Sequence, residues 1–189
     1  PNLDGVISPD ELKTAYQGFV AAFGTSAGDP RFDASYDYNN DENIDAQDWD
    51  LFRDAMNNDA RNWAPKILAI LELLDVDHNF KISNAEAVKG ALIARQILAA
   101  DVGLISMTVV ANYDFSKDGK ISSIDSVFVL QALFAAGYDG SQLGNAVGAT
   151  DPNLDGVISP DELKTAYQGL VAAMKTYDVK YDFNKDNKV

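Results

Sequence analysis

The feature that most constrains the fold is a twelve-residue pattern of oxygen-bearing side chains that recurs along the chain. Its complete copies begin at Asp37, Asp75, Asp114 and Asp151. Each copy offers side-chain oxygens at positions 1, 3, 5, 9 and 12 and has isoleucine at position 8. A repeat of this kind is a property of the whole chain and limits the folds that the chain can adopt.

Oxygens at this spacing suit a hard divalent cation. Calcium takes six to eight oxygen ligands at about 2.3 to 2.6 Å. In a tightly wound loop, alternate positions converge on the ion, position 7 offers its backbone carbonyl, and position 12 offers both carboxylate oxygens. The candidate ligands in the complete copies are Asp37, Asn39, Asp41, Asn43, Asp45, Asp48, Asp75, Asp77, Asn79, Lys81, Ser83, Glu86, Asp114, Ser116, Asp118, Lys120, Ser122, Asp125, Asp151, Asn153, Asp155, Val157, Ser159 and Glu162.

Incomplete copies of the pattern flank the complete ones. The segment 1–22 also recurs at 152–173, changed only where Leu170 replaces Phe19. Such a duplication is typical of a long array, so we expect the chain to be a piece of a larger repetitive protein. The candidate ligands in the incomplete copies are Asn2, Asp4, Val6, Ser8 and Glu11 near the start and Asp182, Asn184 and Asp186 near the end.

Some copies depart from the pattern at position 6, where glycine permits the positive φ that turns the chain. Glu42 and Phe80 occupy this position in the copies at 37–48 and 75–86. A side chain at positive φ costs on the order of 1 kcal/mol, so we expect weaker or differently shaped sites there. At position 12, Asp48 and Asp125 are shorter than glutamate, and two-oxygen coordination then requires the following helix to move closer.

Apolar residues recur at three- and four-residue spacing after the loops, which predicts an amphipathic helix behind each one. The segments before the loops differ in how strongly they predict a helix. Segment 24–36 contains glycines and a proline and is a poor helix. Segment 62–74 predicts a regular helix with Asn62 as N-cap and Pro65 in its first turn. The apolar stripe of this helix is Ile67, Ile70, Leu71 and Leu74.

Loops of this composition followed by helices resemble the EF-hand superfamily over nearly the whole chain. Aspartate at position 12 and the missing helices before some loops are similar to the loop–helix repeats of dockerins. The length and the loop spacing are similar to those of sarcoplasmic calcium-binding proteins. The resemblance implies a mainly α fold of tandem EF-hand repeats, both helix–loop–helix and dockerin-like loop–helix, paired through short β-bridges, with Ca²⁺ as the bound ion.

The resemblance also implies how the loops pair, because EF-hands pair through the apolar residue at position 8. The expected bridges join Ile7 to Ile44, Ile82 to Ile121 and Ile158 to Val189. The incomplete loop at 182–189 is also expected to pair with a loop of another copy of the chain.

The same pattern suggests a division into domains. Residues 1–136 are expected to form an EF-hand body and residues 151–189 a C-terminal pair of loops. Segment 137–150 is rich in glycine and small residues, which favours a linker or hinge between them.

The charge balance limits the classes of partner that the chain is expected to bind. The chain has 29 acidic and 15 basic residues, a net charge of −14. This argues against nucleic acid, because binding a phosphate backbone relies on clustered Lys and Arg. The chain has no cysteine, which excludes thiolate metal sites and thiol catalysis. No apolar run reaches the roughly 18 to 20 residues needed to span a bilayer, so no membrane span is expected.

We expect no enzymatic activity in this segment. The single histidine, His78, is at an outward-facing loop position, and neither a Ser-His-Asp set nor a glycine-rich phosphate loop is present. Trp49 and Trp63 are expected to pack in the core or at an interface.

Two classes of function remain. In the first, calcium folds or rigidifies a structural repeat segment of a larger extracellular or cell-surface protein, with a dockerin-like module that binds a cohesin-like protein as its main variant. In the second, an intracellular, cytoplasmic calcium buffer or sensor opens to expose a groove for a target. Sensor grooves are rich in methionine, and the chain has only 3, so the first class is favoured.

Overall fold

The computed structural model describes residues 6–58 and 62–150, together with 152–153, 159–162, 164–165 and 168. Over these residues the chain is mainly helical, as predicted. Its α-helices are α1 (Pro9–Ala22), α2 (Ala46–Met56), α3 (Ala64–Leu74), α4 (Asn84–Asp101), α5 (Ser123–Ala135) and α6 (Gly140–Thr150). The other elements are the strands β1 (Thr25–Ser26) and β2 (Asn43–Ile44) and the 3-10 helices η1 (Ala34–Tyr36) and η2 (Met107–Val110).

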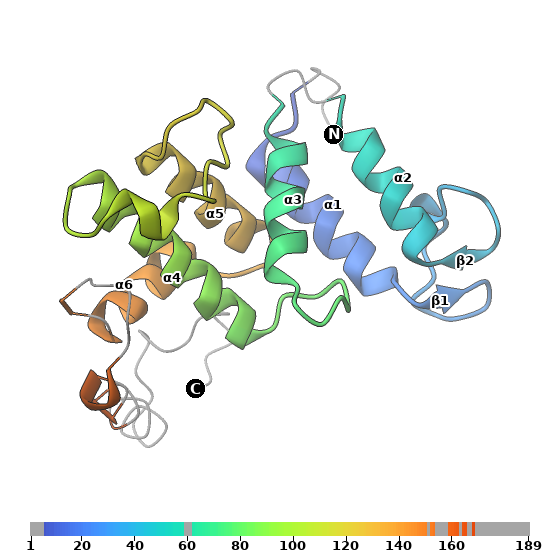
Figure 1. Cartoon of the computed structure of the whole chain (residues 1–189). Helices are drawn as coiled ribbons and strands as arrows, with labels where there is room; N and C mark the ends of the chain where they lie inside the picture. The colour runs from blue at the N-terminus through green and yellow to red at the C-terminus, as the bar shows by residue number, and fades with distance from the viewer. Residues whose placement is uncertain are drawn as a thin grey trace.

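Helices α1 and α3 lie near the middle of the molecule (Figure 1). On one side, α5 packs against α1, α3 and α4, and α6 packs against α4. On the other side lie α2, which contacts α3, and the β1–β2 ribbon (Figure 1). The loops at 37–48, 75–86 and 114–125 connect elements of this helical body and lie at separate places on it.

The core joins the apolar faces of these helices. The stripe predicted on α3 is buried at every position: Ile67, Ile70, Leu71 and Leu74. At the other end of the core, Phe19 of α1 is fully buried, with its ring centroid 5.3 Å from Phe52 and 5.4 Å from Trp49 of α2. Burial of such large rings contributes strongly to stability, because aromatic side chains remove the most apolar surface from water.

Helices α1, α2, α4 and α5 begin directly behind their loops because the last loop residues form capping boxes. In a capping box, the N-cap oxygen accepts an N–H of the first helical turn, and the acidic residue three positions later accepts the N–H of the N-cap. The pairs are Ser8 with Glu11, Asp45 with Asp48, Ser83 with Glu86 and Ser122 with Asp125. Positions 9 and 12 of the repeat therefore set the helix starts.

The start of α3 differs from the prediction. Trp63 is the N-cap and makes no side-chain cap hydrogen bond. Asn62, predicted as the cap, lies before it in the left-handed region with φ 53°. Asparagine adopts this region more readily than most residues, so Asn62 turns the chain ahead of the helix instead of capping it. Pro65 lies in the first turn, as predicted.

The predicted bridge from Ile44 to Ile7 is wrong. Ile44 in β2 pairs with Thr25 in β1, and Asn43 pairs with Ser26. The reason is the turn at Gly24, whose φ of 75° sends the chain back beside loop 37–48 as soon as α1 ends. The Gly24 N–H then donates to the Ile44 carbonyl at 2.8 Å.

The predicted bridge from Ile82 to Ile121 is also absent, since neither residue belongs to a strand. The carbonyl of Ile82 instead accepts the Tyr138 hydroxyl at 2.9 Å. The third predicted bridge, from Ile158 to Val189, lies outside the described residues.

The segment 137–150 contains a helix where a linker or hinge was predicted. Helix α6 packs on α4, and Leu143 and Val147, one turn apart, are buried. The glycines permit this packing, because a Cβ at Gly148 would collide with the guanidinium of Arg95. Low helix propensity is therefore outweighed by tertiary contact.

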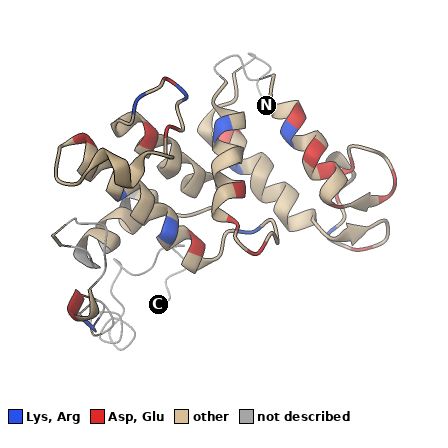
Figure 2. Cartoon of the chain, viewed as in Figure 1, with Lys and Arg blue, Asp and Glu red and all other residues tan. Residues whose placement is uncertain are grey.

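Acidic side chains are spread over the loops and helix ends, with few basic side chains among them (Figure 2). Arg53 pairs with Asp50 at 2.9 Å and with Glu72 at 2.8 Å. None of the helices in the described part of the chain combines the length and the apolar character needed to cross a membrane.

Candidate metal-binding loops

The loops at 37–48, 75–86 and 114–125 share one backbone conformation. In each loop, positions 4 and 6 both have positive φ. The values are 60° at Asn40 and 68° at Glu42, 55° at His78 and 62° at Phe80, and 61° at Lys117 and 82° at Gly119. Two left-handed residues separated by one residue wind the chain tightly enough to turn alternate side chains toward a common centre.

The position-1 carboxylate is fixed in the same way in all three loops. One of its oxygens accepts the N–H of position 5, and the other accepts the N–H of position 6. The distances are 3.1 and 3.0 Å at Asp37, 3.1 and 2.8 Å at Asp75, and 3.2 and 3.0 Å at Asp114. These bonds orient the carboxylate and leave further lone pairs on both oxygens for a cation.

The position-12 carboxylate joins the two ends of each loop. One oxygen accepts an N–H near the loop start, and the other accepts the N–H of position 9. The partners are Tyr38 at 2.7 Å and Asp45 at 2.9 Å for Asp48, Val76 at 2.7 Å and Ser83 at 2.8 Å for Glu86, and Ser116 and Ser122, both at 2.8 Å, for Asp125. Aspartate reaches both ends as glutamate does, and Asp48 and Asp125 are fully buried.

The middle of each loop is also braced from within. The side-chain oxygen at position 5 accepts the N–H of position 7 in all three loops: Asp41 from Asn43 at 2.9 Å, Asn79 from Lys81 at 2.8 Å and Asp118 from Lys120 at 2.9 Å. Asn39 at position 3 accepts the N–H of Asp41 at 3.0 Å. The candidate ligands of each loop are therefore held by hydrogen bonds of the loop itself.

Loop 75–86 brings its acidic side chains closest together. One carboxylate oxygen from each of Asp75, Asp77 and Glu86 lies within 4.8 Å of the others, which is the spacing of ligands around one ion. Asp75 and Glu86 are each only 7% exposed, whereas Asp77 faces solvent. Three of the predicted ligands thus converge, from positions 1, 3 and 12 of the repeat.

The pKa values in these loops reflect burial against hydrogen bonding. Burial raises the pKa of Asp75, assisted by Asp77 and the nearby charge of Glu86, and the N–H donors of Phe80 and Asn79 only partly offset it. For Glu86, burial is outweighed by hydrogen bonds from Ser83 and Val76, so its pKa is lowered. For Asp114, burial is likewise outweighed by donors that include the Gly119 N–H, and its pKa is lowered. A cation at 75–86 would offset the desolvation that raises the pKa of Asp75.

The position-9 side chains act as helix caps rather than pointing only into the loops. Asp45 accepts the N–H of Gln47 at 2.7 Å, and Ser122 accepts the N–H of Ile124 at 3.3 Å. The Ser83 hydroxyl donates to Glu86 at 2.8 Å. Position 9 is therefore suited to act on an ion through a water molecule, as the EF-hand pattern allows.

Phe80 shows why an aromatic residue occupies a position that favours glycine. Its ring centroid lies 4.4 Å from Phe23, the C-cap of α1, and 5.4 Å from Trp49 of α2. The Tyr16 hydroxyl donates to its carbonyl at 3.3 Å, and burial raises the pKa of Tyr16, so the donor proton is retained. Packing holds the left-handed backbone, a compensation that local sequence rules do not foresee.

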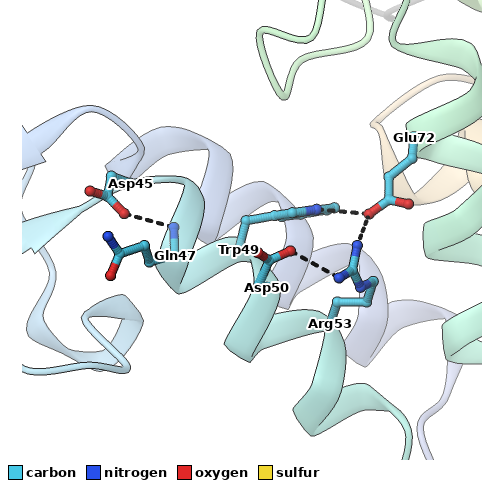
Figure 3. A network of polar contacts seen from close by, with 6 residues as sticks. All are labelled: Asp45, Gln47, Trp49, Asp50, Arg53 and Glu72. Carbon is cyan, nitrogen blue, oxygen red and sulfur yellow. Dashed lines mark hydrogen bonds and ion pairs between the residues drawn. The ribbon is translucent and has the colours of Figure 1, made fainter.

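A cavity of about 280 Å³ adjoins this loop, and its lining includes Tyr16, Trp49, Glu72, Asp75 and His78. Glu72 of α3 accepts the indole N–H of Trp49 at 2.9 Å and an Arg53 guanidinium N–H at 2.8 Å (Figure 3). Sequence reasoning missed this junction of α2 and α3, because no repeat position marks Glu72. His78 is exposed, and Trp49 is buried, as predicted.

The remaining predicted ligands belong to the first copy, the last complete copy and the incomplete copy near the end. In the first copy, Ser8 and Glu11 form the capping box of α1, Val6 is described, and Asn2 and Asp4 lie outside the described residues. In the last complete copy, Asn153, Ser159 and Glu162 are described. The predicted ligands outside the described residues are Asp151, Asp155 and Val157 in that copy and Asp182, Asn184 and Asp186 in the incomplete copy near the end.

Comparison of the chain with protein-family models, with curated proteins and with solved structures finds no match. The functional interpretation therefore depends on the loops themselves.

Proposed function

We propose that this chain is a calcium-binding structural segment of the EF-hand type, folded or rigidified by Ca²⁺ as part of a larger extracellular or cell-surface protein. The observation that carries the proposal is the convergence of Asp75, Asp77 and Glu86, whose carboxylate oxygens lie within 4.8 Å of one another. Carboxylates that converge in a loop with further amide and hydroxyl oxygens are the ligands that Ca²⁺ prefers.

Electrostatics supports a divalent cation. The chain has a net charge of −14, and its acidic side chains gather in loops where like charges face each other at short range. Such a group is stabilised when a cation neutralises it, and burial raises the pKa of Asp75, so the charged carboxylate is disfavoured there relative to water. A bound ion stabilises the folded chain by RT ln(1 + [Ca²⁺]/Kd) for each site.

The attachments of the loops favour a structural role. Each position-12 carboxylate ties the loop to the first turn of the next helix, and Phe80 ties loop 75–86 to the aromatic core. Ions that order these loops therefore also order the helix starts and the packing. A sensor needs a helix pair that opens easily, which such connections oppose.

A protein-binding module, dockerin-like or sensor-like, is the second candidate, and one observation favours it. Exposed apolar side chains follow from the end of α4 through η2, and the start of α5 lies beside the end of α4, since the Asp101 carboxylate accepts the Ser123 N–H at 3.0 Å. We name this group the α4–η2 patch; it consists of Leu98, Val102, Leu104, Met107, Val109 and Ile124. Contiguous exposed apolar side chains are typical of interaction surfaces.

Calorimetric titration of the chelator-stripped protein with calcium, followed in parallel by circular dichroism, tests the proposal. We expect binding at several sites and a gain of helix. Asp77→Asn should weaken one site at least tenfold, and Asp54→Asn, an exposed carboxylate of α2 outside every loop, should change nothing. Absence of binding, or an Asp77→Asn titration identical to that of the parent chain, would contradict the loop assignment.

The fluorescence of an apolar dye such as anilinonaphthalene sulfonate distinguishes the protein-binding module from the structural role. A structural role predicts that dye fluorescence falls as calcium orders the chain. A sensor predicts the opposite, because filled loops would then expose apolar surface. A rise that Val102→Ser removes would assign the effect to the α4–η2 patch.

A further inference from the structure

Helix α1 fills a groove that we define by α5, the α2 face of Trp49 and Phe52, and Tyr36. The side chains that α1 buries there are Leu12, Tyr16, Phe19 and Ala22. The duplicated segment carries the same face at Leu163, Tyr167, Leu170 and Ala173. One chain therefore contains two segments with the sequence that recognises this groove.

The second copy also begins its helix as the first does. The Ser8 N–H donates to Glu11 at 2.9 Å, and the Ser159 N–H donates to Glu162 at 2.8 Å. One turn further, the Thr14 hydroxyl donates to the Asp10 carbonyl at 2.8 Å. The equivalent bond from Thr165 to Asp161 measures 2.9 Å. The hydrogen bonds that start the helix are therefore the same in both copies.

A demanding feature of the fit is retained as well. A Cβ at Gly18 would collide with the Tyr36 hydroxyl group, so only glycine lets Tyr36 lie against α1. The second copy has glycine at the matching position, Gly169. The differences lie at the aromatic end, where Leu170 and Met174 stand in place of Phe19 and Phe23. The second copy therefore retains the glycine that this packing requires, but it lacks the two aromatic rings at that end.

We propose that segment 152–173 of one chain fills the α1 groove of a second copy of the chain, displacing that chain's own α1. Helix α6, which leads into the segment, packs on α4, away from the start of α1 (Figure 1), so the exchange joins separate chains. A segment of one chain bound to a different surface of the next is a heterologous contact, which yields rings where the rotation between copies closes and open chains of subunits where it does not. The exchange goes beyond calcium binding and does not depend on it.

Thiol cross-linking tests the exchange directly, because the parent chain has no cysteine. Lys13 Nζ lies 4.2 Å from the centre of the Phe134 ring, and Lys164 is the counterpart of Lys13. Because this contact joins the ends of two long side chains, a flexible bis-maleimide is used to span the two thiols in place of a direct disulfide. A chain with Lys164→Cys and Phe134→Cys, unfolded and refolded at high concentration and fixed calcium, should give covalent dimers and longer species on treatment with the bis-maleimide. Lys13→Cys with Phe134→Cys should cross-link within a monomer, and Lys164→Cys with Val109→Cys on exposed η2 should give no ladder. Monomers alone from the first pair, with cross-linking in the second, would overturn the proposal.

A second experiment opens the groove in the full chain. Leu12→Asp with Phe19→Asp should remove α1 from its groove, and we expect the protein to remain cooperatively folded with at least twice the parent mass by light scattering. Adding Leu163→Asp should abolish that assembly, whereas adding Lys164→Asp, on the exposed side of the same turn, should not. Equal mass and equal loss of structure with and without Leu163→Asp would overturn the proposal.

Discussion

Replacement by glycine at position 6 should change stability in opposite directions in loops 37–48 and 75–86. Glu42 and Phe80 both have positive φ, 68° and 62°. Glycine removes the strain of a side chain in this region, roughly 1 to 2 kcal/mol. It also adds conformational entropy to the unfolded chain, which costs about 1 kcal/mol. The backbone alone therefore favours glycine by up to about 1 kcal/mol at both positions.

The side chains separate the two positions. Glu42 is exposed, so Glu42→Gly should raise the free energy of unfolding by up to about 1 kcal/mol. Phe80 is half-buried against Phe23 and Trp49. Truncating a core phenylalanine costs about 3 to 5 kcal/mol. Half of that cost, less the backbone gain, leaves Phe80→Gly destabilised by roughly 0.5 to 2.5 kcal/mol.

Urea unfolding at one fixed calcium concentration, followed by circular dichroism, measures these changes. A calcium titration of each variant allows the binding contribution, RT ln(1 + [Ca²⁺]/Kd), to be subtracted. Phe80→Ala keeps the strain and loses the ring, so it should be the least stable of the set. A Phe80→Gly protein as stable as Glu42→Gly would refute the view that ring packing holds Phe80 in its left-handed conformation.

Three further outcomes are expected. Gly18→Ala should lower the free energy of unfolding by roughly 1 to 3 kcal/mol because its methyl group meets Tyr36. Gly144→Ala, with open space around it on α6, should raise the free energy of unfolding by roughly 0.5 to 1 kcal/mol. Thermal melts of both variants test these opposite changes. Glu72→Ala should cost roughly 1 to 3 kcal/mol by leaving the buried Trp49 N–H without its acceptor, and Asp50→Ala roughly 0 to 1 kcal/mol; equal costs in urea unfolding would contradict this. As the pH falls from neutral, loop 75–86 should lose calcium before loop 114–125. The raised pKa of Asp75 lets protons compete with calcium at higher pH, whereas the pKa of Asp114 is lowered. Calcium titrations of Asp75→Asn and Asp114→Asn across this pH range follow the two loops separately, and the reverse order of calcium loss would contradict the pKa directions. Without metal, the sign reverses for stability: the folded chain holds the Asp75 proton more tightly, so that contribution is present at low pH and is lost as the pH rises through the raised pKa.

The helices behind the loops were predictable because two local signals coincide there. A capping box such as Ser83 with Glu86 starts the helix, and an apolar stripe continues directly behind it. Both signals act within a few residues, so distant contacts do not override them. The same locality explains the buried stripe of α3.

The strand pairing could not be predicted from local pattern. Which segment lies beside Ile44 depends on where α1 ends and on the reversal at Gly24. The expectation of a bridge to Ile7 was carried over from a family resemblance, and this chain brings Thr25 there first.

Helix α6 was not predicted, because its local sequence argues against a helix. Its glycines and alanines predict weak helix formation, yet the absence of side chains at Gly140 and Gly148 allows close approach to Leu130 and Arg95. The benefit of small residues becomes visible only when the neighbouring helices are in place.

For the candidate site, the spacing of the repeat identified Asp75, Asp77 and Glu86, and the structure brings them together. The spacing gave no indication of the surroundings, because Trp49, Glu72 and Arg53 come from two helices that meet only in the fold. Phe80 was recognised as a departure from the repeat, but its packing partners are distant in sequence.

The attachment of Phe80 also affects the rate at which an ion would leave loop 75–86. Its N–H donates to Asp75, its carbonyl accepts from Tyr16, and its ring packs on Phe23. Loop 75–86 must break these contacts together before it can open, whereas Gly119 offers no side chain to restrain loop 114–125. An ion at 75–86 is therefore expected to dissociate more slowly than one at 114–125, so a brief fall in calcium would empty one loop while the other stays filled and ordered.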